Sequence, residues 1–396
     1  MRIAVLGGLG LQGKSAIHYL AAKNIVSEVV CADLDAANTG LKRLADFVKV
    51  INLKKVKMVS LDASSHDDMV NFLKEGIDAA VDLLPAKLMP QAFKASIDAR
   101  VPLVSTNYSQ AIQHLGKHAK EAGIRIMPEC GFDPGIDLVL LGHGARQFDA
   151  LEAFDSYGGA IPDKDACDNV INYKISWTWE GVLMTQLRES VFIHEGSRRI
   201  ITADKQHENR YIHQIDFPGL GTLEAFPNGD AAHFADALGI SEKISRATRY
   251  SLRWPGWCDF WRILKKLGFL SDQPIDDLDL SLTPFEFMVR FLEPRLQYSS
   301  NEKDLAILHV VLEGIKNSRR KRIVYSLLAE RDLASGIFAL HKMVSYPACA
   351  VAIMMANGEI KGKGLLSPIS DIPFEPFMKV LSESDIQVRE EIEYLN

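Results

Sequence analysis

The chain has 396 residues, of which 47% are hydrophobic and 24% are charged, as is ordinary for a globular protein large enough for two domains. The formal net charge is −6, and the sequence has no basic stripe with interleaved aromatic residues, so we expect no nucleic-acid partner. The five cysteines are scattered and form no C-x-x-C motif, which argues against a disulfide framework and favours a reducing compartment.

Apolar runs are short throughout the chain. The longest, such as residues 348–356, fall well below the length that crosses a bilayer. A core strand is predicted from residue 2, which leaves no room for a signal peptide. We therefore expect a cytoplasmic protein with no membrane partner.

The N-terminal segment has the pattern strand, glycine turn, helix, strand, acid. An apolar strand is predicted over residues 2–6, and Gly8, Gly10 and Gly13 then follow the G-x-G-x-x-G spacing. In such a motif the first glycine permits the tight turn, the second lets the backbone approach a pyrophosphate, and the third lets the helix pack on the strand. A second buried strand ends at Asp33, where a carboxylate can bind the hydroxyls of an adenosine ribose.

This pattern predicts a dinucleotide site. We expect Gly8 and Gly10 to contact the cofactor together with Leu11 and Gln12, which begin the helix and offer its free N–H groups to the phosphates.

Strands and helices continue to alternate up to residue 127. Four more strands are predicted, over residues 57–61, 79–84, 103–106 and 124–127. Six strands with helical crossovers, such as those at 90–99 and 110–122, indicate an α/β fold with a Rossmann-type, doubly wound parallel sheet. Because ligands bind at the carboxyl ends of such strands, we add the residues that follow them to the cofactor site: Asp62, Pro85, Thr106 and Asn107.

The pattern changes after Gly131. A helix over residues 136–148 precedes a second α/β domain with a mixed or antiparallel sheet. Its strands are predicted at 153–157, 173–179, 198–202, 223–226, 249–253, 307–313 and 323–329, and its helices at 258–267 and 285–292. Helices at 347–356 and 374–381 are expected to pack back on the nucleotide domain. We therefore expect a dinucleotide-binding domain of residues 1–130, completed by 345–396, and a substrate-binding and dimerisation domain of residues 131–344.

Three groups outside the glycine turn could carry chemistry. Asp133 could cap the following helix with Pro134 at its first position, or it could face substrate across the crevice between the domains. Asp230 reads as a helix cap after a turn. Arg253 stands among bulky side chains, and could be a packed cation or a bidentate clamp for a carboxylate.

No metal site is predicted. His114 and His118 have the four-residue spacing of a helical ligand pair, but no acid or cysteine stands beside them in the sequence.

Several motifs resemble the saccharopine dehydrogenase family, in its glutamate-forming saccharopine reductase branch and the related lysine 6-dehydrogenases. They lie at residues 104–108, 120–124, 131–137, 156–162, 172–177, 226–230 and 251–253. The resemblance implies that Thr106 and Asn107 flank the nicotinamide. It also implies that the amino-acid substrate is held by Tyr108, Asp133, Asn228 and Arg253, with Trp177 nearby, and that the protein is a homodimer.

Two positions depart from the saccharopine reductase pattern. Gly229 stands where those enzymes carry an arginine after the Pro-Asn pair, so one clamp for a substrate carboxylate is missing. Asp33 stands near the place of a basic residue suited to a 2′-phosphate and would repel that phosphate, so we expect NAD rather than NADP. Both departures favour the lysine 6-dehydrogenase type, whereas the long similarity through the second domain favours saccharopine.

The expected activity is an NAD(P)-dependent oxidation of a C–N bond in a lysine-derived amino acid, with Tyr108 and Asp133 as catalytic candidates. For saccharopine, the products would be glutamate and 2-aminoadipate 6-semialdehyde, or the reaction would run in reverse. The alternatives are a lysine 6-dehydrogenase, a dinucleotide-binding sensor or scaffold without catalysis, and a reductase of carboxylated diamines.

Overall fold

The computed structural model describes residues 1–47, 51–274 and 282–395. The chain forms two compact units, each built from more than one segment. The first unit comprises Met1–His143, Ala334–Ile337 and His341–Gln387, and the second comprises Gly144–Leu333, Phe338–Leu340 and Val388–Asn396.

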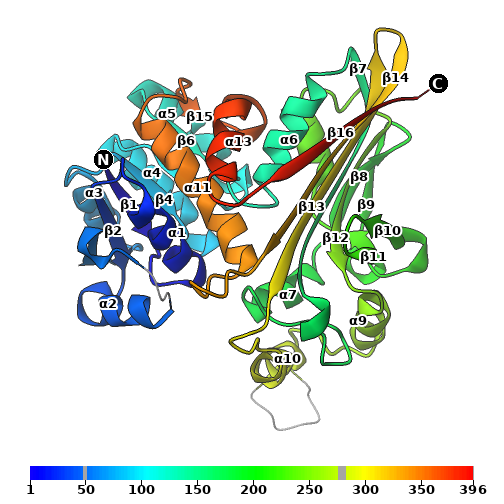
Figure 1. Ribbon diagram of the computed structural model, residues 1–396, viewed down its shortest axis with the longest axis horizontal. Helices are drawn as coiled ribbons and strands as arrows, with labels where there is room; N and C mark the ends of the chain where they lie inside the picture. The colour runs from blue at the N-terminus through cyan, green and yellow to red at the C-terminus, as the bar shows by residue number, and fades with distance from the viewer. Residues whose placement is uncertain (48–50, 275–281, 396) are drawn as a thin grey trace. The chain divides into compact units, whose positions relative to one another are not determined.

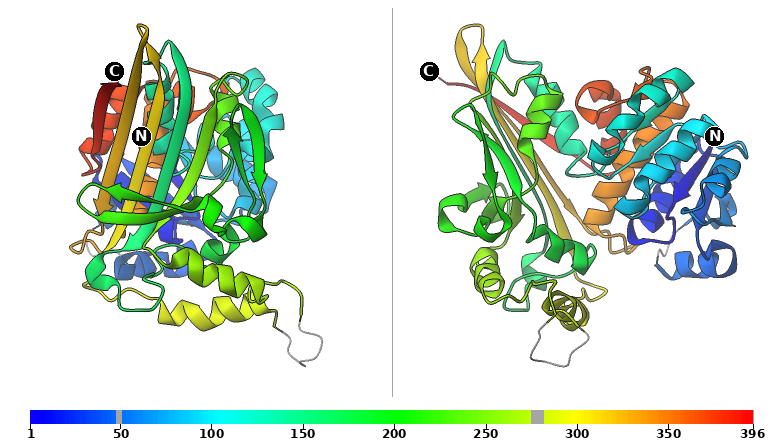
Figure 2. Two further views of the ribbon diagram at one scale, coloured as in Figure 1. Left: turned by 90° about the vertical axis from the view of Figure 1, so that its right-hand side faces the viewer. Right: turned by 180° about the vertical axis from the view of Figure 1, so that it is seen from behind.

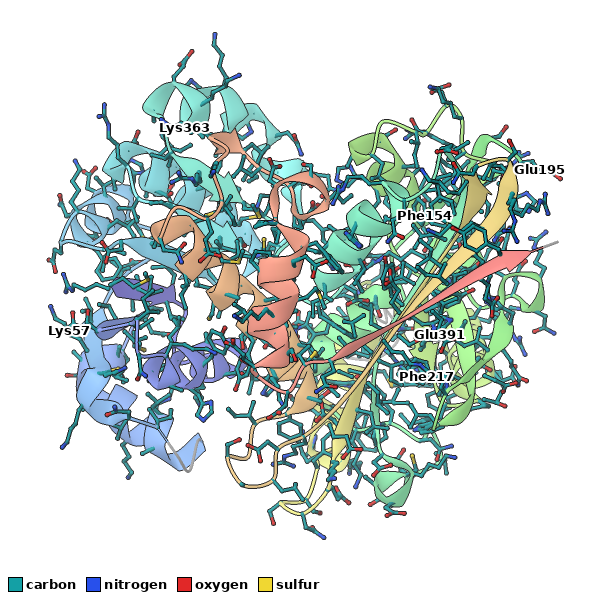
Figure 3. All side chains as sticks on the ribbon, turned by 45° about the horizontal axis from the view of Figure 1, so that its top comes forward. Lys57, Phe154, Glu195, Phe217, Lys363 and Glu391 are labelled. Atoms are coloured by element: carbon teal, nitrogen blue, oxygen red, sulfur yellow. The ribbon has the colours of Figure 1, made fainter. Side chains whose placement is uncertain are left out.

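The first unit is built on a parallel sheet of seven strands in the order β15-β6-β5-β4-β1-β2-β3. The strands are β1 (Arg2–Leu6), β2 (Glu28–Asp33), β3 (Val56–Ser60), β4 (Ala79–Asp82), β5 (Leu103–Ser105), β6 (Arg125–Met127) and β15 (Gly364–Leu365). The six strands predicted from the sequence are all present, and β15 adds a seventh beside β6. Figure 3 marks the two ends of the sheet with Lys57 on β3 and Lys363 just before β15.

Helices cover both faces of this sheet. They are α1 (Leu11–Ala22), α2 (Ala36–Phe47), α3 (His66–Leu73), α4 (Met89–Ala99), α5 (Gly116–Ala122), α6 (Ile136–Ala145), α11 (Ala339–Ala356), α12 (Pro368–Asp371) and α13 (Phe374–Ser382). Ala4 and Leu6 on β1 pack with Met69 and Phe93 of α3 and α4. On the other face α1 and α11 lie side by side (Figure 1), and the Ser345 hydroxyl donates to Ser15 Oγ at 2.9 Å. The predicted doubly wound α/β architecture is confirmed.

Helix α11 is 18 residues long and apolar enough by composition to cross a membrane. However, 72% of it is buried inside the protein, as is typical of a core helix. The sequence predicted only the second half of this helix, residues 347–356. Pro347 instead lies inside the helix.

The second unit is built on a mixed sheet of nine strands in the described residues, with the main path β10-β11-β12-β7-β13-β14-β16. The strands are β7 (Ala150–Pro162), β8 (Ser190–His194), β9 (Ser197–Ile201), β10 (His213–Phe217), β11 (Gly221–Pro227), β12 (Arg246–Arg253), β13 (Asp304–Lys316), β14 (Arg319–Glu330) and β16 (Val388–Leu395). Strands β7 and β12 are parallel, and the other neighbours are antiparallel. Figure 2 shows the long strands side by side, from β16 in red to β7 in green. The helices of this unit are α7 (Trp179–Thr185), α8 (Ala231–Ala237), α9 (Trp257–Lys266) and α10 (Pro284–Leu292).

The predicted strand at residues 173–179 is wrong. The backbone there is satisfied locally: the Asn169 side chain donates to the Tyr173 carbonyl at 2.9 Å, and the Ile175 N–H donates to the Leu296 carbonyl at 2.8 Å. Trp179 then begins α7, fully buried, with its indole N–H donating to the Met288 carbonyl. The alternation of bulky and polar residues therefore reflects packing of a loop into an aromatic core rather than a pleated strand.

The start of α11 depends on one buried carboxylate. Asp304 on β13 is fully buried and accepts the N–H groups of Ala339 at 2.7 Å and Leu340 at 3.0 Å. These are two of the amides that a helix leaves without an internal partner at its N-terminus.

We predict that Asp304→Ala lowers the free energy of unfolding by about 2–3 kcal/mol, because it leaves these two amides without their acceptor. Urea denaturation measures this. The control is Asp216→Ala, which removes an exposed carboxylate that accepts from Thr222 and should change stability by less than about 0.5 kcal/mol. Equal effects of the two substitutions would contradict the role of Asp304.

Candidate functional site

The glycine turn of the first unit differs in one respect from its prediction. The left-handed residue is Gly7, with φ +74°, and its N–H donates to the Ala32 carbonyl at 2.9 Å. The sequence had assigned the tight turn to Gly8. Gly8 is required for a different reason, because a Cβ there would lie 2.6 Å from the Cys31 Sγ atom on β2.

The other two glycines shape a cradle at the start of α1. A Cβ on Gly13 would lie 2.3 Å from the Gly7 carbonyl oxygen, so only glycine lets the helix approach the turn this closely. A Cβ on Gly10 would meet no described atom within 4 Å except that same oxygen, so the outer side of the turn is open. Gly10 also precedes α1 without a capping side chain, which leaves the first-turn N–H groups available to an anion.

The first helical residues fit a dinucleotide as well. Leu11 is partly exposed at the start of α1. Both polar atoms of the Gln12 carboxamide are covered, and neither has a hydrogen-bond partner within the described part of the chain. A buried amide without partners is costly unless a ligand satisfies it. The open cradle and this amide therefore fit a bound pyrophosphate.

Asp33 does more than end β2. Its Oδ2 atom accepts the Leu9 N–H at 3.0 Å, and its Oδ1 atom accepts the Leu34 N–H at 2.9 Å. Its carboxylate thus ties the glycine turn to the end of β2. On the same side of the unit, burial raises the pKa of the Cys31 thiol to about 12, and the Arg43 guanidinium on α2 opposes part of that rise.

Two other expected cofactor residues follow strands of this sheet. Asp62 follows β3 and is exposed, and its carboxylate accepts the backbone N–H and the hydroxyl of Ser64 at 2.9 and 2.7 Å. These bonds lower the pKa of Asp62. Pro85 follows β4, is exposed and precedes a short 3₁₀ turn.

The loop after β5 is joined to the loop after β6. The Glu129 N–H donates to the Asn107 carbonyl and the Cys130 N–H donates to the Ser105 carbonyl, each at 2.9 Å. The buried Glu129 carboxylate accepts the N–H and the hydroxyl of Ser109 at 3.0 and 2.9 Å. Sequence reasoning missed Glu129, although an acid directly after an apolar strand is a signal of a satisfied buried charge.

Asp133 lies in a tight loop beside these residues. Gly131 N–H donates to the Pro134 carbonyl at 2.9 Å, and a Cβ on Gly131 would lie 3.4 Å from the Thr106 Cβ. The interpretation of Asp133 as a helix cap is wrong, because α6 begins at Ile136 and its N-terminal amides are served by Asp137. The first unit thus brings Thr106, Asn107, Tyr108 and Asp133 into two joined loops.

Sequence reasoning also missed Asp82, the last residue of β4. Its carboxyl group is fully buried, and its Oδ1 atom accepts the Leu84 N–H at 3.1 Å. Burial raises the pKa of Asp82 to about 6, and the side chain of Ser105 on β5 opposes part of this rise. Acids are rare in the interior of such sheets, so an aspartate ending an apolar strand was the available signal.

The second unit holds the remaining predicted substrate residues. Strands β11 and β12 are antiparallel, with Glu224 opposite Arg253 and Phe226 opposite Ser251. The Asn228 N–H donates to the Arg249 carbonyl at 2.9 Å, which continues this register beyond the strand. Residues two apart share a face of a strand, so Arg253 lies on the same face of the sheet as Phe226.

Arg253 is caged by aromatic rings. Its guanidinium carbon lies 5.3, 5.9 and 5.1 Å from the ring centres of Tyr173, Phe226 and Trp257. Its Nη1 atom donates to the Leu252 carbonyl at 2.7 Å, while its buried Nε atom has no partner within the described residues. Arg253 is thus packed against aromatic rings, but it is buried and is not the surface cation that the sequence suggested as one interpretation. The same cage fixes a guanidinium that retains a donor for a carboxylate.

The other residues around this site have local roles. Trp177 is partly exposed and lies over α7, where a Cβ on Gly181 would be 2.8 Å from its ring. Gly229 has φ +71°, a conformation that a side chain would strain. Asp230 caps α8 by accepting the His233 N–H at 2.8 Å, as predicted. Among residues 1–47, 51–274 and 282–395, no group of three or more His, Cys, Asp or Glu side chains is arranged to hold a metal ion.

The doubly wound sheet and its glycine cradle define a dinucleotide-binding protein. The family model described as the saccharopine dehydrogenase NADP binding domain matches residues 3–127, and that of the saccharopine dehydrogenase C-terminal domain matches residues 131–386. The chain therefore belongs to the saccharopine dehydrogenase family. The predicted family is confirmed.

Individual relatives are distant but similar over long stretches. Alpha-aminoadipic semialdehyde synthase of Rattus norvegicus, a mitochondrial protein, is 25% identical over 97% of this chain and 47% of its own length, so the chain spans about half of that relative. The saccharopine dehydrogenase [NADP(+), L-glutamate-forming] of Pyricularia oryzae is 26% identical over 97% of this chain and 98% of its own. The solved apo saccharopine dehydrogenase (L-Glu forming) from Saccharomyces cerevisiae superposes with a TM-score of 0.85 over 99% of both chains at 22% identity, which shows the common fold.

The expected preference for NAD over NADP is wrong. The matched family domain is an NADP binding domain, and two relatives matched over 96% and 98% of their own length are named as NADP(+) enzymes. The error lay in reading Asp33 as a carboxylate directed at the ribose, whereas both of its oxygens accept backbone N–H groups. The carboxylate is thus engaged with the glycine turn, and both the Asp33 carboxylate and the Arg43 guanidinium act on the Cys31 thiol of β2.

We predict a pH-dependent difference in stability between the wild type and Asp82→Asn. The pKa of Asp82 is about 6 in the folded protein and about 3.9 when unfolded, so the folded state binds the extra proton between these values. The contribution of Asp82 to stability is therefore present below pH 4 and falls by about 3 kcal/mol as the pH rises to 6. Asparagine has no such titration.

Urea denaturation of both proteins from pH 4 to 7 measures this difference. Asp304, whose pKa burial also raises to about 6, titrates in both proteins and cancels in the comparison. A difference between the two proteins that stays constant over this range contradicts the prediction.

Proposed function

We propose that this protein is an NADP-linked saccharopine dehydrogenase of the glutamate-forming type. It would convert saccharopine, NADP⁺ and water to glutamate, 2-aminoadipate 6-semialdehyde, NADPH and a proton. The observation that carries the proposal is the caged Arg253 with its free Nε donor, in a chain similar over its whole length to an enzyme named for this reaction. A guanidinium fixed in this way suits a substrate rich in carboxylates.

The first unit would hold the cofactor. Gly8, Gly10, Leu11 and Gln12 would bind the pyrophosphate at the cradle of α1, supported by the open side of Gly10 and the unpartnered Gln12 amide. Asp62 and Pro85 would border the cofactor after β3 and β4, and Thr106 and Asn107 would flank the nicotinamide. When bound, the dinucleotide supplies the acceptor for a hydride.

The residues that the family resemblance implies would hold the substrate. Arg253 would bind a carboxylate, with Asn228 and Trp177 lining the site. Tyr108 would hydrogen-bond the substrate nitrogen, and Asp133 would orient an ammonium group or move a proton. The hydride leaves the carbon next to the nitrogen, so the amine must be neutral and this carbon must be held close to its acceptor.

The first prediction from this proposal concerns substrate and cofactor. Saccharopine with NADP⁺ should give an increase in absorbance of the reduced nicotinamide, at a kcat/KM at least about tenfold higher than with NAD⁺. Lysine and carboxylated diamines should be much poorer substrates. Tight NADPH binding without turnover of any of these compounds would favour a sensor, and turnover of lysine alone would favour a lysine 6-dehydrogenase.

The second prediction concerns Arg253. Arg253→Gln should raise the KM for saccharopine by about tenfold to a hundredfold, because a charge-assisted bond to a carboxylate contributes about 1.5–3 kcal/mol. The KM for NADP⁺ should stay unchanged. The control is Arg246→Gln on the same strand, where the arginine pairs with Asp155 and Glu313. An unchanged KM for saccharopine in Arg253→Gln would contradict the assignment of Arg253 as the group that binds a substrate carboxylate.

The cytoplasmic location and the homodimer remain predictions from the sequence. Size-exclusion chromatography with light scattering tests the second.

A further inference from the structure

The end of β4 carries a buried acid that the proposed reaction does not use. Asp82 is directly opposite Ser105 in the register of the parallel strands β4 and β5. Its Oδ1 atom accepts the Leu84 N–H, while the buried Oδ2 atom has no hydrogen bond of normal geometry within the described residues. A buried carboxylate oxygen without a hydrogen-bond partner is costly in the interior, so the groups next to Asp82 must compensate it.

One such group is the Ser105 hydroxyl, which opposes part of the rise in the pKa of Asp82. The Ser105 oxygen already accepts two bonds from Asn107: one from its backbone N–H at 3.2 Å and one from its side-chain Nδ2 at 3.4 Å. A hydroxyl has one hydrogen and two lone pairs. With both lone pairs in use, its single hydrogen is left for the carboxylate of Asp82.

The Asn107 side chain has one more anchor, and it fixes the direction of the carboxamide. Its Nδ2 atom also donates to the Leu84 carbonyl at 3.3 Å. A backbone carbonyl can only accept, so the NH₂ end must face Leu84 and Ser105. Both amide hydrogens are thereby used inside the protein. The carbonyl oxygen Oδ1 is the end of Asn107 that remains for a ligand.

We propose that Asp82 is a positioning residue: through Ser105 it holds the Asn107 carboxamide with its Oδ1 atom presented as an acceptor for the carboxamide N–H of the nicotinamide. This inference rests on the proposed function, in which Asn107 flanks the nicotinamide. It adds a directed hydrogen bond to that contact and gives Asp82 a positioning role. Without the chain from Asp82 to Ser105 to Asn107, the amide would lose one of its two anchors and could turn its NH₂ end outward.

The test compares two cofactors that differ in one group. NADP⁺ carries a carboxamide with N–H donors, and its 3-acetylpyridine analogue carries a methyl ketone in that place. Dissociation constants of both are measured by isothermal titration for the wild type, Asp82→Ala, Asp82→Asn and Ser105→Ala. The control is Asp98→Asn, which alters an exposed acid on α4.

We expect the wild type and the control to share one ratio of the two dissociation constants. Asp82→Ala and Ser105→Ala should each lower the preference for NADP⁺ by about threefold to tenfold, the effect of one hydrogen bond. Asp82→Asn should retain most of the preference, since its carboxamide oxygen still accepts from Ser105. A role in stability alone would weaken both cofactors equally and leave the ratio unchanged.

An unchanged ratio in both Ser105→Ala and Asp82→Ala overturns the inference while leaving the proposed function intact. If Asp82→Ala does not fold, Ser105→Ala decides the question by itself, because its small change of volume is well tolerated. A wild type that binds neither cofactor would instead refute the proposed function, so the two failures are distinguishable.

Discussion

The contact on which the first unit depends is the approach of α1 to the glycine turn. A Cβ on Gly13 would collide with both Gly7 and Gly8, at 2.3 and 2.6 Å. The helix can therefore approach the turn this closely only while position 13 lacks a side chain. That close packing directs the N-terminal amides of α1 over the carboxyl edge of the sheet, which is where the ends of β4 and β5 place Asp82 and Ser105.

Two buried carboxylates fix the loops at this edge, and each interacts with a serine close by. Glu129 ties the loop after β6 to Ser109, and Asp82 faces Ser105 at the end of β5. Burying such groups is unfavourable unless their bonds are met. A loop fixed by a buried charge has few alternative conformations of similar energy, so the position of Asn107 between these two acids is well determined.

Much of the fold follows from the sequence because its signals are periodic. Apolar runs bounded by turns identified all six strands of the parallel sheet. The mixed sheet was harder. The alternation at residues 173–179 imitates a strand. Strands β10 and β16 lack a strong apolar run, because polar and charged side chains interrupt them, such as Glu391 on β16, labelled in Figure 3. Whether such a segment forms a strand depends on its pairing with residues distant in the sequence. A local sequence pattern does not show that pairing.

Site residues were predictable where a motif implied their chemistry, as for Gly10 and Arg253. They were not predictable where the role depends on a partner distant in sequence. Asp33 illustrates this limit. Its position at the end of β2 suggested a ribose ligand. The cofactor preference cannot be read from this charge alone, because each oxygen of the carboxylate already accepts one backbone N–H, from Leu9 or from Leu34. Whether a carboxylate repels a phosphate depends on how many donors already compensate it. The same reasoning applies to Asp82: its Oδ1 atom accepts one backbone N–H, and the rest of its capacity as an acceptor is left for the Ser105 hydroxyl.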